Sequence, residues 1–159
     1  MNVFEELVEL LIKKEMKVTS AESCTGGLFS SSVVSVPDAS KVLSAAFVTY
    51  SEDAKCRFAD VPRELIDTFG VVSENVAVAM AKGACKNAGA DASVGITGFA
   101  GPAYDENDTS VGTVCFGFCV NGRTLSATRN FGNIGRNAVR ELSAIYAAST
   151  LIKLINSVN

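Results

Sequence analysis

Residues 113–131 read TVCFGFCVNGRTLSATRNF and carry the strongest local structural signal in the chain. Two runs rich in β-branched and aromatic residues, 113–120 and 123–131, flank the dipeptide Asn121-Gly122. Asn-Gly accepts the positive φ angles of a two-residue hairpin turn, and the flanking runs are typical of β-strands. The sequence therefore predicts two antiparallel strands joined at Asn121-Gly122.

On the N-terminal side of this hairpin, strand patterns alternate with helix patterns. Strands are predicted at 16–20, 42–50 and 92–97, and helices at 3–14, 28–36, 51–58, 62–69 and 74–88. On the C-terminal side, one further helix is predicted over 137–155. Such alternation builds parallel strands with helices on both faces, to which the hairpin adds antiparallel strands. We therefore expect an α/β fold, a three-layer α/β/α sandwich around a mixed β-sheet, in one domain over residues 1–159.

The composition is that of a folded globular protein. Hydrophobic residues make up 48% of the 159 residues and charged residues 19%, so a substantial core can form. The net charge of −3 and a sequence pI near 5.0 argue against a nucleic-acid-binding protein, which would carry a basic face. A mean hydropathy of +0.27 favours some surface covered by a partner subunit.

The distribution of apolar residues predicts no membrane segment and no secretory signal. No run reaches the ~18 to 20 uninterrupted apolar residues that a membrane-spanning helix needs. Acidic residues interrupt the N-terminal segment from position 5 onward, so the basic start and apolar block of a signal peptide are missing. The five cysteines are scattered without a C-x-x-C pair and fit reduced thiols. A cytoplasmic location is expected from these features.

The chain contains no histidine. This excludes Ser-His-Asp and Cys-His catalytic groups and also histidine-based zinc sites. A general base would have to be a lysine, a carboxylate, a tyrosine or a cysteine, which narrows the possible mechanisms before any motif is considered.

Residues 21–27, AESCTGG, connect a predicted strand to a predicted helix. In α/β sheets, ligands bind beyond the carboxyl ends of the strands, where such turns lie. Gly26 and Gly27 allow the backbone to approach a ligand and to turn its amide groups toward an anion or a developing oxyanion. Ser23 is then a candidate nucleophile. The alternative is a structural turn in which Ser23 or Thr25 caps the helix.

Tyr50 and Lys55 follow the second predicted strand, at the same rim of the sheet. A lysine can act as a base when burial or cationic neighbours lower its pKa, and a tyrosine hydroxyl can orient it or relay a proton. In the absence of histidine, a Ser23–Lys55 pair is the most direct hydrolytic arrangement that remains. The alternative for Lys55 alone is a solvated surface lysine.

Two further segments are candidates for substrate binding. Gly98-Phe99-Ala100-Gly101-Pro102 follows the strand 92–97 and offers a wall of small residues to a ring or a ribose, although a structural turn is the alternative. Arg136 and Arg140 are spaced i and i+4, so they share a helix face and could hold a phosphate together. Simple salt bridges, for example with Glu141, are the alternative for the two arginines.

Six segments together resemble the CinA C-terminal domain family, in the family's order. They are AESCTGG at 21–27, FVTYS-x-x-AK at 47–55, GVVSE at 70–74, TGFAGP at 97–102, VGTV at 111–114 and RNAVR at 136–140. Each segment alone would be a weak signal, whereas the combination is specific and covers almost the whole chain.

The resemblance implies an activity and assigns roles to residues. Stand-alone members of the family are nicotinamide-nucleotide amidases (the PncC type), which convert nicotinamide mononucleotide to nicotinic acid mononucleotide and ammonia. By resemblance, Ser23 is the nucleophile, and Tyr50 and Lys55 are its activating partners. The implied substrate-binding residues are Cys24, Thr25, Gly26, Gly27, Thr97, Gly98, Ala100, Gly101, Pro102, Gly112, Arg136 and Arg140. The implied activity makes a small nucleotide the expected ligand. The family needs no metal or organic cofactor, and it commonly forms dimers, so the resemblance implies a homodimer or a higher homo-oligomer.

Two segments depart from the family pattern, both on the expected phosphate side. Residues 131–136 read FGNIGR, with Gly135 where the family has an aspartate and one additional residue before Arg136. Residues 103–110 read AYDENDTS, without the family's usual glycines or its proline before Val111. The alternative function is a nucleotide-binding module with weak catalysis. A DNA-associated competence factor is disfavoured by the acidic pI.

Overall fold

The structure, a computed structural model, describes residues 1–158. The elements in chain order are α1 (Val3–Lys13), β1 (Val18–Glu22), α2 (Leu28–Val34), the 3-10 helix η1 (Ala39–Lys41), β2 (Phe47–Val48), α3 (Glu52–Ala59), α4 (Arg63–Phe69), α5 (Glu74–Ala88), β3 (Ala92–Gly98), β4 (Thr113–Val120), β5 (Arg123–Asn130) and α6 (Arg136–Ser157). All the predicted helices are present, and their ends differ from the predicted ends by at most two residues.

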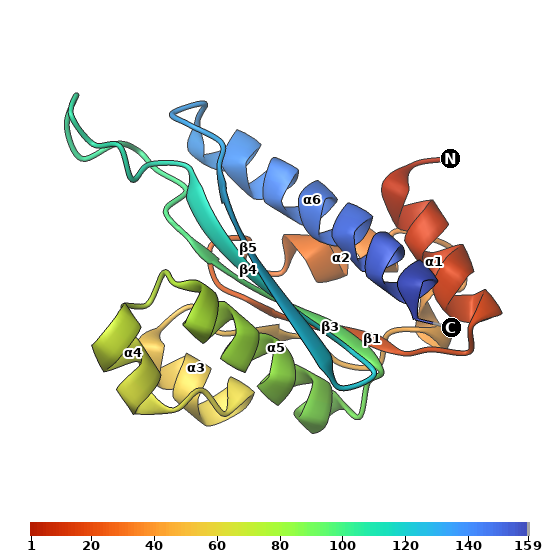
Figure 1. Cartoon of the computed structure of the whole chain (residues 1–159). Helices are drawn as coiled ribbons and strands as arrows, with labels where there is room; N and C mark the ends of the chain where they lie inside the picture. Colours follow the sequence, from red (N-terminus) through yellow and green to blue (C-terminus); the bar gives the residue numbers. More distant parts are fainter. Residues whose placement is uncertain (159) are drawn as a thin grey trace.

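The five strands form one mixed sheet in the order β2-β1-β3-β4-β5. β1 pairs in parallel with β2 and β3, while β4 runs antiparallel to β3 and β5. Helices lie on both faces of this sheet (Figure 1). The predicted class, α/β with a mixed sheet between two helical layers, is confirmed.

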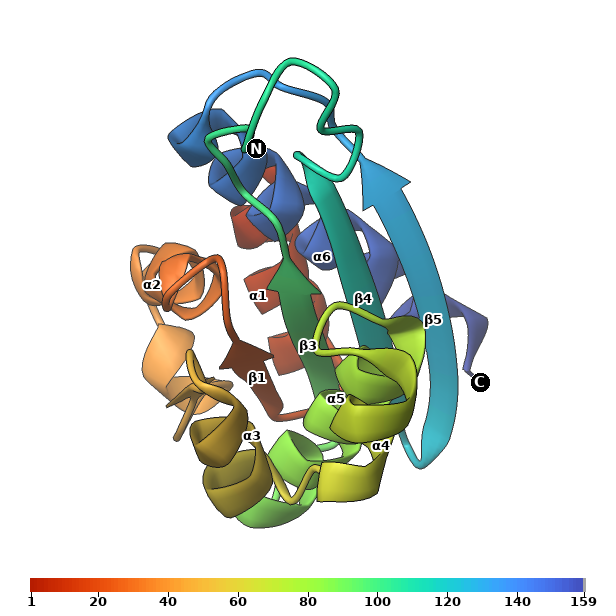
Figure 2. The ribbon, with the colours of Figure 1, turned by 90° about the vertical axis from the view of Figure 1, so that its left-hand side faces the viewer.

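The two helical layers bury different apolar clusters. α1, α2 and α6 pack on one face around side chains such as Phe29 and Phe116, and α3, α4 and α5 cover the other face around Ile66 and Met80. Figure 2 shows β1 and β3 pointing toward the same end of the sheet. The segments that follow these two strands are therefore neighbours, although they are far apart in the sequence.

The predicted hairpin is confirmed. β4 and β5 pair along their whole lengths, and Asn121 and Gly122 between them take φ angles of 49° and 80°. These angles lie in the left-handed region that Asn and Gly accept. The start of β4 also anchors the loop after β3, because the Phe99 amide donates to the Thr113 carbonyl at 2.9 Å.

The first strand lies two residues later than predicted, at Val18–Glu22 rather than at 16–20. We expected Glu22 in a polar turn, but its carboxylate is buried inside the strand layer. It accepts hydrogen bonds from the amides of Phe29 and Ser30, at 2.8 and 3.1 Å, and from the hydroxyl of Ser20 at 2.9 Å. Three hydrogen bonds offset the free-energy cost of removing the carboxylate from water. Glu22 can therefore be the buried last residue of β1 instead of an exposed turn residue.

The prediction of a buried strand over 42–50 is wrong in extent and in burial. Only Phe47–Val48 forms a strand, and Leu43 adds one isolated bridge to Val18. β2 is an edge of the sheet, and the Val48 side chain is 55% exposed. An edge strand and a central strand can share the same apolar composition, so the run VLSAAFVTY did not distinguish them.

Gly83 in α5 lies against the end of α3, the helix that carries Lys55. A Cβ at position 83 would lie 1.6 Å from the carbonyl oxygen of Ala59, so a side chain there must displace α3. We expect Gly83→Ala to lower the free energy of unfolding by about 1 to 3 kcal/mol. Thermal denaturation should show this as a Tm lower by about 3 to 10 °C.

The control for this prediction is Lys82→Ala, an exposed position in the same turn of α5. It keeps the helix and adds no steric contact, so its Tm should stay close to that of the wild type. An unchanged Tm in Gly83→Ala would contradict the close packing of α5 on α3.

Candidate active site

A cavity of about 470 Å³ opens beyond the carboxyl ends of β1 and β3. Its wall is formed by the turn after β1, the start of α3, the segment between α4 and α5, the loop between β3 and β4, and the start of α6. Ligand sites of α/β proteins lie at this end of parallel strands. The structure brings Ser23, Tyr50 and Lys55, the three residues predicted to be catalytic, to this one cavity.

Ser23 is the first residue after β1, and both neighbouring strands hold its backbone. Its amide donates to the carbonyl of Ile96 in β3 at 2.9 Å. On the other side, the Thr49 amide donates to the carbonyl of Glu22 at 2.9 Å. The Ser23 side chain is only 9% exposed, so its hydroxyl faces the cavity from a nearly buried position.

Lys55 is not a surface lysine, because its side chain has no exposed area. Its Nζ lies 3.0 Å from Oγ of Ser23 and 2.8 Å from the carbonyl oxygen of Thr49. Burial lowers the pKa of Lys55 from its ordinary value, while Cys24, Glu52 and Cys56 act in the opposite direction. A lysine that is easier to deprotonate can accept a proton from the serine hydroxyl.

We expected the amides at the N-terminus of α2 to be available to a ligand in the cavity, but they bind a side chain of the protein instead. The amides of Phe29 and Ser30 both donate to the carboxylate of Glu22, which takes the place that an anionic ligand would occupy. The Gly26 amide is also engaged, since it donates to the Ser23 carbonyl at 3.0 Å. The turn thus differs from the predicted anion site at a helix terminus.

Two amides of the same turn have no such partner. Within residues 1–158, neither a backbone nor a side-chain oxygen of another residue accepts from the amides of Cys24 and Thr25. Both amides follow the Ser23 residue directly in the chain. Apart from the amide of Ser23 itself, which donates to Ile96, they are therefore the backbone donors closest in sequence to the candidate nucleophile.

Cys24 lines the cavity beside Ser23. Its thiol is buried, and burial raises its pKa to about 11, against the smaller opposing effects of its backbone and of Lys55 and two arginines. A thiol with this pKa is almost fully protonated at neutral pH and is a weak nucleophile. Of the adjacent Ser23 and Cys24 side chains, Ser23 is the one that forms a hydrogen bond with Lys55, the candidate base.

Tyr50 lines the cavity, but within the described residues its hydroxyl forms no hydrogen bond with Lys55. Its hydroxyl accepts a hydrogen bond from a guanidinium nitrogen of Arg136 at 3.0 Å. Another nitrogen of the same guanidinium donates to the carbonyl of Gly101. Arg136 thus faces the cavity, and the additional residue before it in the sequence does not turn it away.

Arg140 does not line the cavity with Arg136. Its guanidinium donates to the carbonyls of Cys24 and Thr25, each at 3.0 Å, and to the side chain of Asn137 at 2.9 Å. The i, i+4 spacing put the two arginines on one helix face, but only Arg136 lines the cavity. Arg140 instead holds the turn that follows Ser23.

The predicted wall of small residues is present, and Thr97, Gly98, Ala100, Gly101 and Pro102 all line the cavity. Thr25, Gly26, Gly27 and Gly112 do not line it and shape the surrounding backbone instead. Gly112, for example, has a φ of 83°, and a Cβ there would lie 2.2 Å from the carbonyl oxygen of Gly132. This close approach joins the end of the 103–110 loop to the segment before α6.

Two acidic residues of the cavity were not predicted. Glu52 lies three residues before Lys55 in α3, and this i, i+3 spacing is the sequence signal that could have revealed it. Asp108 lies in the loop before β4, where its carboxylate accepts from the Tyr104 and Ser110 amides at 2.9 Å each. No spacing rule connects Asp108 to the other residues of the cavity.

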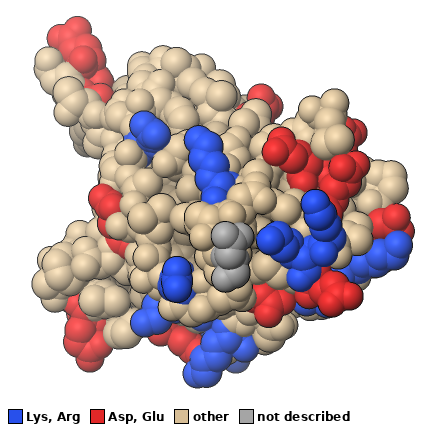
Figure 3. Space-filling view, turned by 45° about the vertical axis from the view of Figure 1, so that its right-hand side comes forward, with Lys and Arg blue, Asp and Glu red and all other residues tan. Residues whose placement is uncertain are grey.

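The charged side chains do not form one basic surface on the face shown in Figure 3, where lysines and arginines alternate with acidic residues. Within the described residues 1–158, no helix has the length and apolar character needed to cross a lipid bilayer.

Comparisons with known proteins agree on one family. The model of the CinA C-terminal domain matches residues 1–155. Protein YdeJ of Escherichia coli K12 is 35% identical over 154 residues, which cover 97% of this chain and 89% of that protein. A CinA-like protein of Kosmotoga olearia is 41% identical over 143 residues, which cover 90% of this chain and 34% of that protein.

A solved structure gives the same result. The crystal structure of a competence-damaged protein (CinA) superfamily protein from Escherichia coli matches with a TM-score of 0.90 at 35% identity, covering 96% of this chain and 88% of that chain. The chain spans about a third of the length of three of the curated relatives that it matches. The matched residues 1–155 include every segment that lines the cavity.

Proposed function

The chain belongs to the CinA C-terminal domain family, and on this premise we propose that it is an amidohydrolase with Ser23 as nucleophile. The proposed substrate is nicotinamide mononucleotide, which is deamidated to nicotinic acid mononucleotide and ammonia. The observation that carries the proposal is the 3.0 Å contact between Ser23 Oγ and the fully buried Lys55 Nζ at the cavity wall. Serine–lysine pairs are one of the known substitutes for the Ser-His-Asp triad.

In the first half of the proposed reaction, Ser23 Oγ attacks the carbon of the carboxamide. Neutral Lys55 donates an N–H to the Thr49 carbonyl, which leaves its lone pair available to the serine hydroxyl. The lysine takes the hydroxyl proton as the new C–O bond forms. It then transfers a proton to the amide nitrogen, the C–N bond breaks, and ammonia leaves an ester on Ser23.

The negative oxygen formed during this attack needs donors close to the nucleophile. Among the described residues, no oxygen of another residue accepts from the amides of Cys24 and Thr25, whereas the Gly26 amide donates to the Ser23 carbonyl. A well-placed donor of this kind contributes about 3 kcal/mol to the transition state. Arg140 supports the role by holding the carbonyls of the same two residues, which orients the turn.

In the second half, water attacks the ester on Ser23. Lys55, neutral again after ammonia has left, accepts a proton from this water, and the serine oxygen leaves with that proton. The products are the nucleotide carboxylic acid and the regenerated hydroxyl of Ser23. The sum is one amide and one water converted to one acid and one ammonia.

The phosphate of the substrate is assigned to Arg136. Its guanidinium lies at the cavity, and a charge-assisted contact to a phosphate is worth roughly 1.5 to 3 kcal/mol. We therefore expect Arg136→Ala to raise KM for nicotinamide mononucleotide about 10- to 100-fold with a smaller change in kcat. Steady-state kinetics of ammonia release measure both parameters.

The control substrate is nicotinamide riboside, which lacks the phosphate. The wild type should use it poorly, and Arg136→Ala should leave its kcat/KM unchanged. A wild type that prefers the riboside would contradict the assignment of the phosphate to Arg136.

The proposed function is tested by incubating the full chain with nicotinamide mononucleotide and measuring ammonia together with nicotinic acid mononucleotide. Equimolar formation of the two products is expected. Tight binding without either product would instead identify a nucleotide-binding module of the same fold, and neither binding nor turnover would overturn the proposed substrate.

A further inference from the structure

Glu52 lies in the first turn of α3, three residues before Lys55. Residues at i and i+3 share a helix face, and both side chains line the cavity. Ser51 fixes the start of the helix, because its hydroxyl accepts from the amide of Ala54 at 3.0 Å. The carboxylate of Glu52 is therefore held at the rim of the cavity that contains Ser23 and Lys55.

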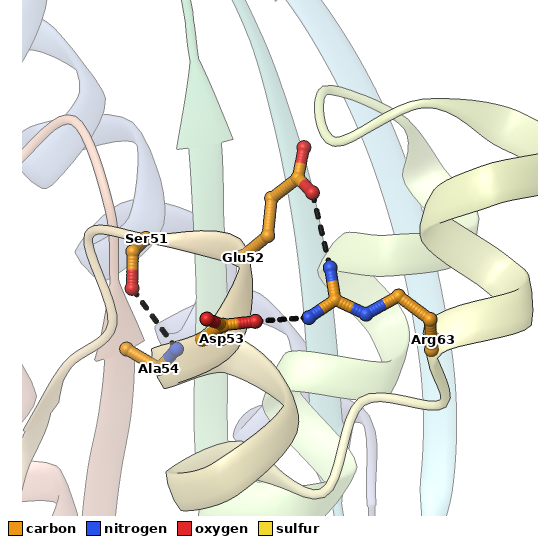
Figure 4. A network of polar contacts seen from close by, with 5 residues as sticks. All are labelled: Ser51, Glu52, Asp53, Ala54 and Arg63. Atoms are coloured by element: carbon orange, nitrogen blue, oxygen red, sulfur yellow. Dashed lines mark hydrogen bonds and ion pairs between the residues drawn. The ribbon is translucent and has the colours of Figure 1, made fainter.

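Arg63, at the start of α4, fixes the orientation of Glu52 without lining the cavity (Figure 4). One guanidinium nitrogen donates to Oε2 of Glu52 at 3.1 Å, and a second one pairs with Asp53. Figure 4 shows the other carboxylate oxygen of Glu52 pointing away from Arg63. Two carboxylates share one guanidinium, so this rim keeps an excess negative charge.

The remaining charges of the cavity do not remove this excess. Its wall also carries the acid Asp108 and the bases Lys55 and Arg136. Lys55 must be neutral to act as a base, and burial lowers its pKa in that direction, whereas the Glu52 carboxylate raises it. With Lys55 neutral, two carboxylates face one arginine. A positive charge on the substrate would balance Glu52.

Aromatic side chains occupy the same wall. Tyr50 and Phe99 both line the cavity and both are exposed. Aromatic faces attract cations and stack on flat rings. A flat, positively charged ring is therefore the group that matches both the carboxylate and the aromatic surfaces.

We propose that Glu52 determines specificity by selecting a carboxamide carried on a cationic aromatic ring, such as an N-substituted pyridinium, over the same amide on a neutral ring. The inference rests on the proposed amide hydrolysis for its reaction, while the selection itself is a property of binding. A phosphate on the same ligand is taken by Arg136, so the two ends of the ligand carry opposite charges.

The test compares two ligands that differ in ring charge. Nicotinamide mononucleotide has a cationic pyridinium ring, and its dihydro form has a neutral ring with the same amide, ribose and phosphate. Calorimetry gives Kd for both ligands on the 159-residue chain carrying Ser23→Ala, with and without Glu52→Gln. Glu52→Gln should raise Kd of the cationic ligand about three- to tenfold, since the carboxylate is partly exposed, and should leave the neutral ligand within twofold.

The control is Asp53→Asn, which removes the second carboxylate on Arg63 but none from the cavity wall. It should leave the ratio of the two Kd values unchanged, and circular dichroism confirms that each variant is folded. Equal weakening of both ligands by Glu52→Gln, an equal effect of Asp53→Asn, or no binding of the cationic ligand would each overturn the proposal.

The experiment also separates this proposal from the proposed function. If the wild type releases no ammonia but Glu52→Gln still raises Kd of the cationic ligand alone, the proposed selection by Glu52 is supported and the proposed hydrolysis is contradicted. If ammonia is released and the Kd ratio does not change, Glu52 has no part in specificity and the hydrolysis stands.

Discussion

Ser23→Ala is expected to lower the rate of ammonia release from nicotinamide mononucleotide by roughly 10³-fold or more, while Kd for the nucleotide stays within about tenfold. The hydroxyl forms a bond only in the transition state and the ester, so its loss removes chemistry rather than affinity. Single-turnover assays measure the rate, and calorimetry on the same protein measures Kd. Ser23→Cys should retain at most a trace of activity.

Cys24→Ala is the matched control for this prediction, because Cys24 is adjacent in the chain and lines the same cavity. Its thiol, with a pKa raised by burial to about 11, is protonated at neutral pH, so the variant should keep activity within a few-fold. Hydrolysis by Ser23→Ala at more than a few per cent of the wild-type rate, together with loss of activity in Cys24→Ala, would make Cys24 the nucleophile.

The parts of the fold that follow from local chemistry were predictable. Asn121-Gly122 identified the hairpin, because few dipeptides accept two successive positive φ angles. Ser51 and Ser73 identified the starts of α3 and α5, where each hydroxyl accepts from an amide three residues later. These signals involve residues close in the sequence, and so a single sequence contains them.

What could not be predicted depends on contacts between distant residues. Glu22 looked like a turn residue, and only the amides of α2 explain why its carboxylate is buried in β1. Phe47 and Val48 form an edge strand, beyond which no further strand pairs within residues 1–158, and composition does not record this position.

In the candidate site too, some features were predictable from the sequence and others depend on tertiary contacts. The absence of histidine pointed to a serine–lysine pair, and the structure gives Lys55 a 3.0 Å contact with Ser23. The i, i+4 spacing of Arg136 and Arg140 correctly placed them on one helix, but did not reveal that Arg140 holds two backbone carbonyls. Which partner a guanidinium finds is decided by the turn packed against it, a tertiary contact that helical spacing does not contain.

Lys55→Met should lower kcat by roughly 10²- to 10⁴-fold, the range for loss of a general base. Methionine retains much of the volume of the buried side chain but has no nitrogen to accept the Ser23 proton. Lys55→Arg should restore little, because a guanidinium stays protonated at all working pH values and cannot act as a base. Lys82→Ala, which removes an exposed lysine that does not line the cavity, should behave as the wild type.

The pH dependence of kcat/KM of the wild type also tests the assignment of Lys55 as the base. Protonated Lys55 is inactive, so activity should rise with pH through the pKa of Lys55 and then level off. Because burial lowers that pKa, the rise should lie below the ordinary lysine value of 10.5. Glu52→Gln removes a carboxylate that raises the pKa, so it should move the rise toward lower pH. A profile that is flat between about pH 6 and 9, combined with full activity of Lys55→Arg, would rule out Lys55 as the base.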